Sequence, residues 1–257
     1  MIPWLAAGSD APFPPVELAL ATPNGLLCAG ADLGVSRLLA GYRSAIFPWF
    51  NEGEPPLWWS PDPRMVLEPA SLHIARRLER TARRLPWHFS VNQRFADVLK
   101  GCAAPRADDH GTWLHAWMIE AYVELHRHGF AHSIEIYLPA DLSAERPGPS
   151  GYCDDQPMRL VGGTYGVAMG AVFFAESMFS AARDASKIAL LALTRLLARS
   201  HCALIDCQLN TPHLRALGAT EIPRSQLIQA IAPDTPRAPL LKPQPLSPLG
   251  LLLHSAA

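Results

Sequence analysis

The stretch Val161–Lys187 has the sequence VGGTYGVAMGAVFFAESMFSAARDASK. Glycines interrupt its apolar residues, and a glycine within a strand marks a place where a backbone or a ligand approaches closely. Asp184-Ala185-Ser186-Lys187 is a helix-start signal, and the run Ile188–Leu197 after it has apolar residues at helical spacing. The stretch therefore predicts two strands, at 159–166 and 167–174, then a pocket and a helix.

One acid, Glu176, lies among the apolar residues Phe173, Phe174, Met178 and Phe179 of this stretch. A carboxylate in such surroundings is costly unless something pairs with it. A second unusual segment follows, where 202–208 has the pattern of a buried strand and carries an acid and an amide two residues apart, Asp206 and Gln208. Residues two apart on a strand point to the same face, so we expect these two side chains to lie together.

Composition sets limits on the class of protein. The chain has 257 residues, 49% of them apolar, a mean hydropathy of +0.07 and a net charge of −1. Contact with nucleic acid would therefore need a local basic patch. Its five cysteines form no C-x-x-C pair, which favours a reducing compartment over a disulfide framework. No apolar run approaches the ~18 residues of a transmembrane helix, and the first fifteen residues lack the basic start of a signal peptide, so we expect a cytoplasmic protein.

The distribution of turn-forming residues predicts three regions. Residues 1–66 are short segments broken by Pro and Gly around one helix at 36–43, which indicates a small N-terminal domain. Residues 67–232 alternate strands and helices, with a loop or insertion at 139–158. From residue 233 the chain is rich in Pro, and we expect an extended tail that is mobile or lies over the surface.

Two surfaces suggest nucleic acid. Tryptophans concentrate between residues 49 and 59, and they form either an aromatic core or a platform on which a base stacks. A helix predicted to begin at Ser71 repeats arginines on one broad face, at Arg76, Arg77, Arg80, Arg83 and Arg84. Because only Glu79 offsets them locally, we favour a phosphate-binding face over a solvated one.

The histidines at 126, 128 and 132 have the density of a metal site but not its pattern. His128-Gly129 is a helix C-terminal signature, and no Cys or carboxylate completes a ligand spacing. We therefore expect no metal.

The sequence lacks the common catalytic fingerprints. It has no G-x-S-x-G motif, no Walker loop and no Rossmann fingerprint. The remaining features, an apolar pocket with Glu176, the Asp206 and Gln208 pair, aromatic rings and a basic helix, suit a bulky apolar group carried on a nucleic acid. The order strand, strand, helix, strand after two earlier helices also suggests an α+β core like that of the acyl-CoA N-acyltransferases, the GNAT fold.

A resemblance to one family runs in order over roughly residues 22–228. The chain resembles the bacterial leucyl/phenylalanyl-tRNA–protein transferases. The matching blocks are PNGLL (23–27), Tyr42 with IFPWF (46–50), WWSPDPR (58–64), LHI (72–74), GTW (111–113), HSIE (132–135), VGG (161–163) with YGV (165–167), ESMFS (176–180), ASK (185–187), LIDCQ (204–208), LGA (217–219) and EIPR (221–224).

The resemblance implies an activity and its partners. Members transfer Leu or Phe, and Met less well, from tRNA to a protein whose N-terminus is Arg or Lys, which marks the product for degradation by the N-degron route. It implies attack of the acceptor α-amine on the tRNA 3′ ester, no metal or cofactor, and a small N-terminal domain before an acyltransferase-like domain. We expect a monomer.

Site residues follow from the same resemblance. Asp206 and Gln208 fall at the positions expected to orient the amine and the ester carbonyl, with Glu176 fixing the aminoacyl end or the polar network. Glycines 162, 163 and 166 would let the tRNA 3′ end approach. The other implied residues are Trp49 and Trp113 for the terminal adenosine, Phe173, Leu190 and Ile205 for the amino-acid side chain, and Arg76, Arg80, Arg83 and Arg84 for the acceptor stem.

The chain departs from the family pattern in the pocket. Thr164 and Ala175 stand where the family often has Met and Gly, which leaves the preference among Leu, Phe and Met open. Two other functions compete with transfer from tRNA. An acetyl-CoA-dependent N-acyltransferase needs a pyrophosphate loop, for which residues 159–164 are the nearest candidate. A non-catalytic RNA-binding module would have no use for Glu176, Asp206 and Gln208 together.

Overall fold

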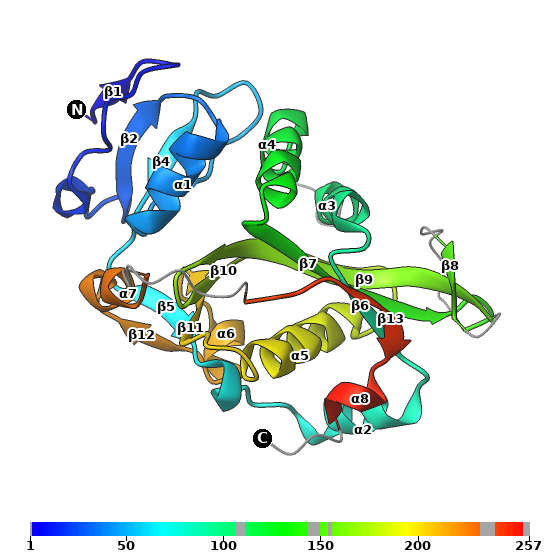
Figure 1. Ribbon diagram of the computed structural model, residues 1–257. Helices are drawn as coiled ribbons and strands as arrows, with labels where there is room; N and C mark the ends of the chain where they lie inside the picture. The colour runs from blue at the N-terminus through cyan, green and yellow to red at the C-terminus, as the bar shows by residue number, and fades with distance from the viewer. Residues whose placement is uncertain (1, 106–111, 143–149, 154–155, 232–239, 254–257) are drawn as a thin grey trace.

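The structure, a computed structural model, describes residues 2–105, 112–142, 150–153, 156–231 and 240–253. It has mixed α/β architecture with two sheets (Figure 1). The smaller sheet has the order β1-β2-β4-β3. Its strands are Trp4–Leu5 (β1), Leu26–Gly30 (β2), Phe47–Pro48 (β3) and Leu57–Trp59 (β4), and a 3-10 turn spans Val16–Leu18.

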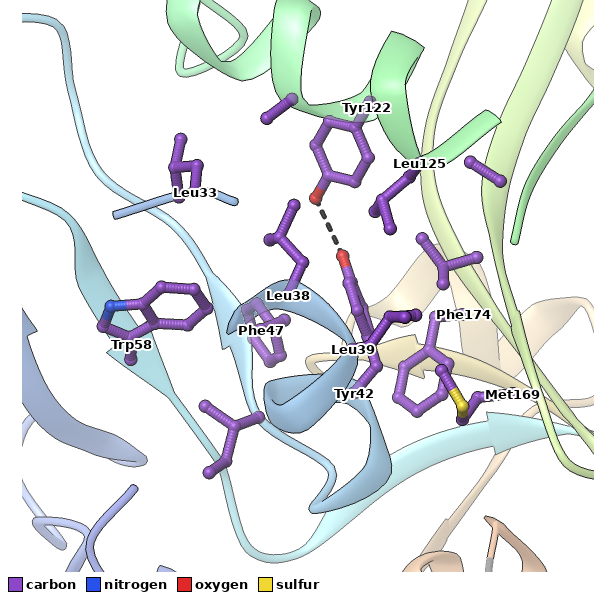
Figure 2. Packing of buried hydrophobic residues seen from close by; sticks show 14 of the residues in the cluster. Leu33, Leu38, Leu39, Tyr42, Phe47, Trp58, Tyr122, Leu125, Met169 and Phe174 are labelled. Atoms are coloured by element: carbon purple, nitrogen blue, oxygen red, sulfur yellow. Dashed lines mark hydrogen bonds between the residues drawn. The ribbon is translucent and has the colours of Figure 1, made fainter. Parts of the chain in front are cut away.

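Helix α1, Val35–Arg43, covers the small sheet, as its helical spacing predicts. Its apolar side meets Trp58, which is 0% exposed and donates its indole N–H to the carbonyl oxygen of Gly30 at 2.9 Å. Figure 2 shows that this core continues to the larger sheet, where Tyr42 of α1 lies beside Phe174 and faces Tyr122. The two parts of the molecule therefore share a core.

The larger sheet carries most of the chain and has the order β12-β5-β11-β10-β9-β7-β6-β13, with β8 paired to β9. Among the described strands only β10 and β11 pair in parallel within this sheet. The strands are Arg64–Leu67 (β5), His88–Val91 (β6), Ala131–Pro139 (β7), Ser150–Cys153 (β8), Gln156–Met169 (β9), Val172–Ser180 (β10), Leu204–Gln208 (β11), Thr220–Ile222 (β12) and Gln244–Pro248 (β13).

Helices cover both faces of this sheet, and an apolar core lies under each layer (Figure 1). One layer holds Phe95–Ala103 (α3) and Ala116–Arg127 (α4). The other holds Arg76–Arg84 (α2), Ala185–Leu197 (α5) and Gly250–Leu253 (α8). The remaining helical segments are Pro69–Ser71, a 3-10 turn, Pro212–Ala216 (α6) and Arg224–Ile231 (α7). No described helix is long and apolar enough to cross a membrane.

The glycine-rich hairpin forms, but its turn is not where we predicted it. β9 continues through Gly166 to Met169, and the chain turns at Gly170, which has φ +59°. This left-handed conformation suits glycine, whereas Gly166 is needed for space, because a Cβ there would lie 2.1 Å from the carbonyl oxygen of Phe174. Glu176 therefore lies within β10 and not after a strand.

The other two glycines also serve packing within the protein. A Cβ on Gly162 would lie 2.6 Å from that of Ala185 on α5, and one on Gly163 would meet the carbonyl oxygen of Ile134 at 2.8 Å. All three strand glycines are buried. The expectation that they admit a tRNA end is therefore wrong, because other protein elements fill the space beside them.

Two further expectations need correction. The arginine-rich helix begins at Arg76 and not at Ser71, which ends a 3-10 turn, because the backbone at Leu72 and Ala75 is extended. In the Pro-rich tail, β13 pairs with β6 at the sheet edge, and Leu240, Leu241, Leu249 and Leu252 are buried, so this part is not loose. Strand β5, which spans the predicted boundary at residue 66, lies in the larger sheet.

Candidate active site

A large pocket opens where the two parallel strands stop pairing. β10 and β11 are paired from Val172 with Leu204 to Phe174 with Asp206. Beyond Asp206 the register of β11 against β5 shifts, and Gln208 takes φ +63°. An extra residue of this kind bends a strand away from its neighbour. A pocket of about 830 Å³ lies along the part of β10 that follows.

The walls of this large pocket are mostly apolar and include most of the residues expected there. Thr164, Ala175, Leu190 and Ile205 all line it, together with Met178 and Phe179. The hydroxyl of Thr164 donates to the carbonyl oxygen of Ser177 at 3.0 Å, so it needs no partner from a ligand. Phe173 does not line the pocket: it is 0% exposed, and its ring packs against Gly166.

A smaller pocket of about 170 Å³ adjoins the large one. Trp49 and Trp113, the residues implied for the terminal adenosine, line it, and Glu176, Cys207, Gln208 and Leu214 line both pockets. Trp49 is 42% exposed, and its ring lies 5.4 Å from that of Trp59, whose indole N–H donates to the Trp49 carbonyl oxygen at 2.7 Å. The tryptophan-rich segment thus divides between both interpretations, with Trp58 in the core and Trp49 at a pocket.

Glu176 lies at the junction of the two pockets and is held by two tyrosines. The Tyr42 hydroxyl donates to its Oε1 at 2.7 Å and the Tyr122 hydroxyl to its Oε2 at 3.2 Å. Figure 2 shows the two tyrosines facing each other, with their hydroxyl oxygens 2.8 Å apart. Burial raises the pKa of Glu176 to about 7, although hydrogen bonds from both tyrosines and from Gln208 lower it, and the charge of Asp206 adds to the increase.

Asp206 has the opposite setting. Its side chain is 0% exposed, and the Arg64 guanidinium binds both oxygens, through Nε at 2.9 Å and Nη2 at 2.8 Å. Its Oδ1 also accepts from the backbone N–H of Gln208 at 2.9 Å. The prediction that Asp206 and Gln208 share a face is wrong, because the strand has a bulge between them. Gln208 lines both pockets, whereas Asp206 lines neither.

The arginine face lies apart from the pockets. The five arginines of α2 are exposed, while Leu78 and Ala82 turn inward. Arg83 pairs with Glu79 at 3.0 Å, and Arg77 lies 3.8 Å from Asp184, just before α5. No described carboxylate lies within ion-pair distance of Arg76, Arg80 or Arg84. The pocket-lining Ser186 follows Asp184 closely in the chain, so this face begins near the rim of the large pocket.

The histidines have structural surroundings. His126 hydrogen-bonds the carbonyl oxygen of Ala131 and stacks on Phe95, His128 hydrogen-bonds that of Glu124, and His132 bonds Asn92. Within the described ranges no group of His, Cys, Asp and Glu could hold a metal ion.

Sequence reasoning missed the groups that decide the state of the two acids. Tyr42 occupies an apolar position of its helix, so its pattern is that of a core residue, and nothing near Tyr122 points to Glu176. Arg64 closes the WWSPDPR block, but its partner lies far along the chain. Gly111, in the GTW block, falls outside the described residues.

Comparison with known proteins gives consistent matches. A family model described as leucyl/phenylalanyl-tRNA protein transferase matches residues 66–145 and 153–232, and one for the N-terminal domain of that enzyme matches residues 31–62. The leucyl/phenylalanyl-tRNA–protein transferase of Nitrosomonas europaea is 51% identical over 218 residues, 85% of each chain. That of Nitrosospira multiformis is 48% identical over 90% of this chain and 91% of its own, and that of Stutzerimonas stutzeri 47% over 90% and 94%.

Proposed function

The chain belongs to the leucyl/phenylalanyl-tRNA–protein transferase family and is a transferase, and from this premise we propose that it moves Leu or Phe, and Met less well, from aminoacyl-tRNA to the N-terminal Arg or Lys of an acceptor protein. In this proposal the product is marked for degradation by the N-degron route. Because the donor is aminoacyl-tRNA, we place the reaction in the cytoplasm. We expect a monomer that needs no metal or cofactor.

The observation that carries this proposal is the meeting of two pockets of different chemistry at Glu176 and Gln208. An aminoacyl-tRNA 3′ end has two such parts, a terminal base and an amino-acid side chain, joined by an ester. The pocket beside Trp49 and Trp113 suits a stacked base, since stacking contributes roughly 1–3 kcal/mol per base. The larger apolar pocket suits Leu, Phe or Met, and the ester would then lie at the junction.

Reaction at the junction needs orientation more than activation, because an ester is already an activated acyl donor. Gln208 has an amide that can hydrogen-bond the ester carbonyl or the incoming amine. Asp206 contributes from behind, since its carboxylate holds the backbone N–H of Gln208 while Arg64 holds the carboxylate. We therefore propose Gln208 as a substrate contact and Asp206 as a positioning residue.

We assign the rest of the donor to the arginine face of α2. Arg76, Arg80 and Arg84 have no described carboxylate partner, which supports contact with acceptor-stem phosphates. Arg83 would join them by exchanging Glu79 for a phosphate. The divergence of the parallel strands β10 and β11 at the pocket supports a GNAT-like core that begins near residue 66, and β13 of the C-terminal segment completes its sheet.

The alternatives receive less support. Residues 159–164, the nearest candidate for a pyrophosphate loop, lie within strand β9 and pair with β7, so their backbone is not a free loop. A non-catalytic RNA-binding module does not account for the large apolar pocket behind the aromatic rings.

The test is transfer of labelled amino acid from Leu-, Phe- and Met-tRNA to a peptide that begins with Arg or Lys. We expect labelled product with Leu and Phe and less with Met. Matched peptides, one with an acetylated N-terminus and one that begins with Ala, serve as controls and should remain unlabelled. Absence of transfer from all three tRNAs would overturn the proposal, and equal labelling of the Ala peptide would overturn its acceptor specificity.

A further inference from the structure

Peptide-bond formation from an amine releases a proton, and neither Asp206 nor Gln208 is placed to take it. Asp206 is 0% exposed, and both of its oxygens bind the Arg64 guanidinium. Gln208 lines the pockets, but a carboxamide is a hydrogen-bonding group without a titratable site near neutral pH. The proton needs a different acceptor.

Glu176 is the only carboxylate in the described parts of the chain that lines both pockets. The ionisable or polar groups that face it are Tyr42 of α1, Tyr122 of α4, Tyr165 of β9, and Asp206 and Gln208 of β11. None of these groups is a cation. The guanidinium of Arg64 is bound to Asp206. Glu176 is therefore an acid with no counter-ion among the described residues, placed where the ester would lie.

We propose that Glu176 is the catalytic base of the transfer: its carboxylate takes the proton from the attacking α-amine and returns it to the departing 3′ oxygen of the tRNA. This inference rests on the proposed function. The amine nitrogen forms a bond to the ester carbonyl carbon, the bond from that carbon to the 3′ oxygen breaks, and the proton moves from nitrogen through Glu176 to oxygen. The carboxylate is regenerated, so no other reactant is needed.

The surroundings of Glu176 suit this role. A general base works best when its pKa lies near the operating pH, and burial raises the pKa of Glu176 to about 7. Burial raises the pKa values of Tyr42 and Tyr122 well above their usual range, so both keep their protons and donate to the carboxylate. Their hydrogen bonds fix both oxygens at the junction of the pockets.

The test is the pH dependence of kcat/KM for an Arg-starting peptide at saturating Phe-tRNA. An α-amine has a pKa of about 7.7–8.0 and must be neutral to attack, which gives one ionisation. With Glu176 as base a second ionisation appears near pH 7, so the logarithmic plot steepens to a slope of about two at low pH. In Glu176→Gln we expect a slope of about one and a kcat lower by about 100-fold or more.

Two controls separate this role from a structural one. The affinity of Glu176→Gln for Phe-tRNA should stay within about threefold of wild type, because loss of a chemical step lowers kcat and not binding. Glu176→Asp keeps the carboxylate and should retain the steeper slope at reduced rate. Glu124→Gln, whose side chain on α4 is 44% exposed and pairs with Arg127, should match wild type in rate, slope and tRNA affinity.

The outcomes are distinguishable. If wild-type protein transfers nothing at any pH, the proposed function fails and this inference fails with it. If wild type transfers with a single ionisation, the inference alone fails, whether or not any variant folds. A Glu176→Gln protein with kcat within threefold of wild type, or with loss confined to tRNA affinity, would also overturn it.

Discussion

Asp206 and Glu176 lie on adjacent parallel strands and have opposite surroundings. Asp206 pairs in register with Phe174, two residues before Glu176. Arg64 binds Asp206 through two hydrogen bonds, and both side chains are 0% exposed. Glu176 is bound by neutral tyrosine hydroxyls and borders two pockets.

The partner and not the acid decides which carboxylate is available for chemistry. A guanidinium fixes the negative charge of Asp206 and makes it part of the framework. Hydroxyl groups stabilise the charge of Glu176 only in part, so burial dominates and raises its pKa to about 7. One acid holds the site in place, and the other can exchange a proton there. Four experiments test this contrast.

The largest effect is expected when the framework pair is broken. Arg64→Ala leaves Asp206 as a buried charge without its counter-ion, and such changes cost about 3–5 kcal/mol of folding free energy. Urea unfolding monitored by circular dichroism measures this loss. The double variant Arg64→Met with Asp206→Leu should recover much of it, because an apolar pair of similar size avoids the unpaired charge. A loss below about 1 kcal/mol for Arg64→Ala would mean that the pair is not structural.

Replacing Glu176 should raise the free energy of unfolding, in contrast to the loss expected for Arg64→Ala. Because the pKa of Glu176 is raised in the folded protein, the folded state binds more protons than the unfolded state between pH 4.5 and about 7. Stability from this group is present at low pH and is lost as pH rises through that interval. At pH 8 the free energy of unfolding of Glu176→Gln should therefore exceed that of wild type by up to about 3 kcal/mol, which urea unfolding measures. At pH 4 the two proteins should differ little. A variant less stable than wild type at pH 8 would contradict this account.

A smaller effect is expected from the tyrosines that hold Glu176. Tyr42→Phe keeps the ring, which packs edge-on against Phe174 at 5.0 Å, and removes the 2.7 Å hydrogen bond. That bond lowers the pKa of Glu176, so its loss should move the acidic limb of the rate profile to higher pH. Its loss should also lower the free energy of unfolding by about 2 kcal/mol at pH 8, where Glu176 is charged. Tyr122→Phe removes the longer, 3.2 Å bond and should do less. Equal effects would mean that the two hydroxyls act as one unit.

The smallest effect is expected from exposed arginines. Like the two acids, the arginines differ in whether a partner neutralises their charge. Arg64 is buried and neutralised, whereas Arg76 and Arg80 are exposed without a described acidic partner. If they bind phosphates, changing both to Gln should flatten the dependence of log K for tRNA on log salt by about 0.7–0.9 for each phosphate that they neutralise. Arg127→Gln, exposed on α4 and paired with Glu124, is the control. An unchanged slope in the double variant would mean that the arginine face of α2 is solvated and does not bind phosphates.

Local patterns predicted the elements well, and the site only in part. The helix predicted after the Asp184-to-Lys187 signal forms as α5, and the pocket residues Leu190 and Ile205 follow from this helix and from a strand that sequence identifies. The orientation of Asp206 could not be predicted, because the bulge beside it depends on pairing with β5, far away in the chain. The two tyrosines come from α1 and α4, and only the tertiary fold brings them to Glu176.

The edge strand β13 has a consequence for how the chain acquires its fold during synthesis. Its partner β6 precedes it by most of the chain, so β6 leaves the ribosome long before the strand that covers its outer edge. Until then the edge of β6 exposes unpaired backbone groups, which invite pairing with other chains. Long-range strand pairing is also slow to form. Release of a nascent chain before β13 should therefore increase aggregation while leaving the residues of both pockets intact.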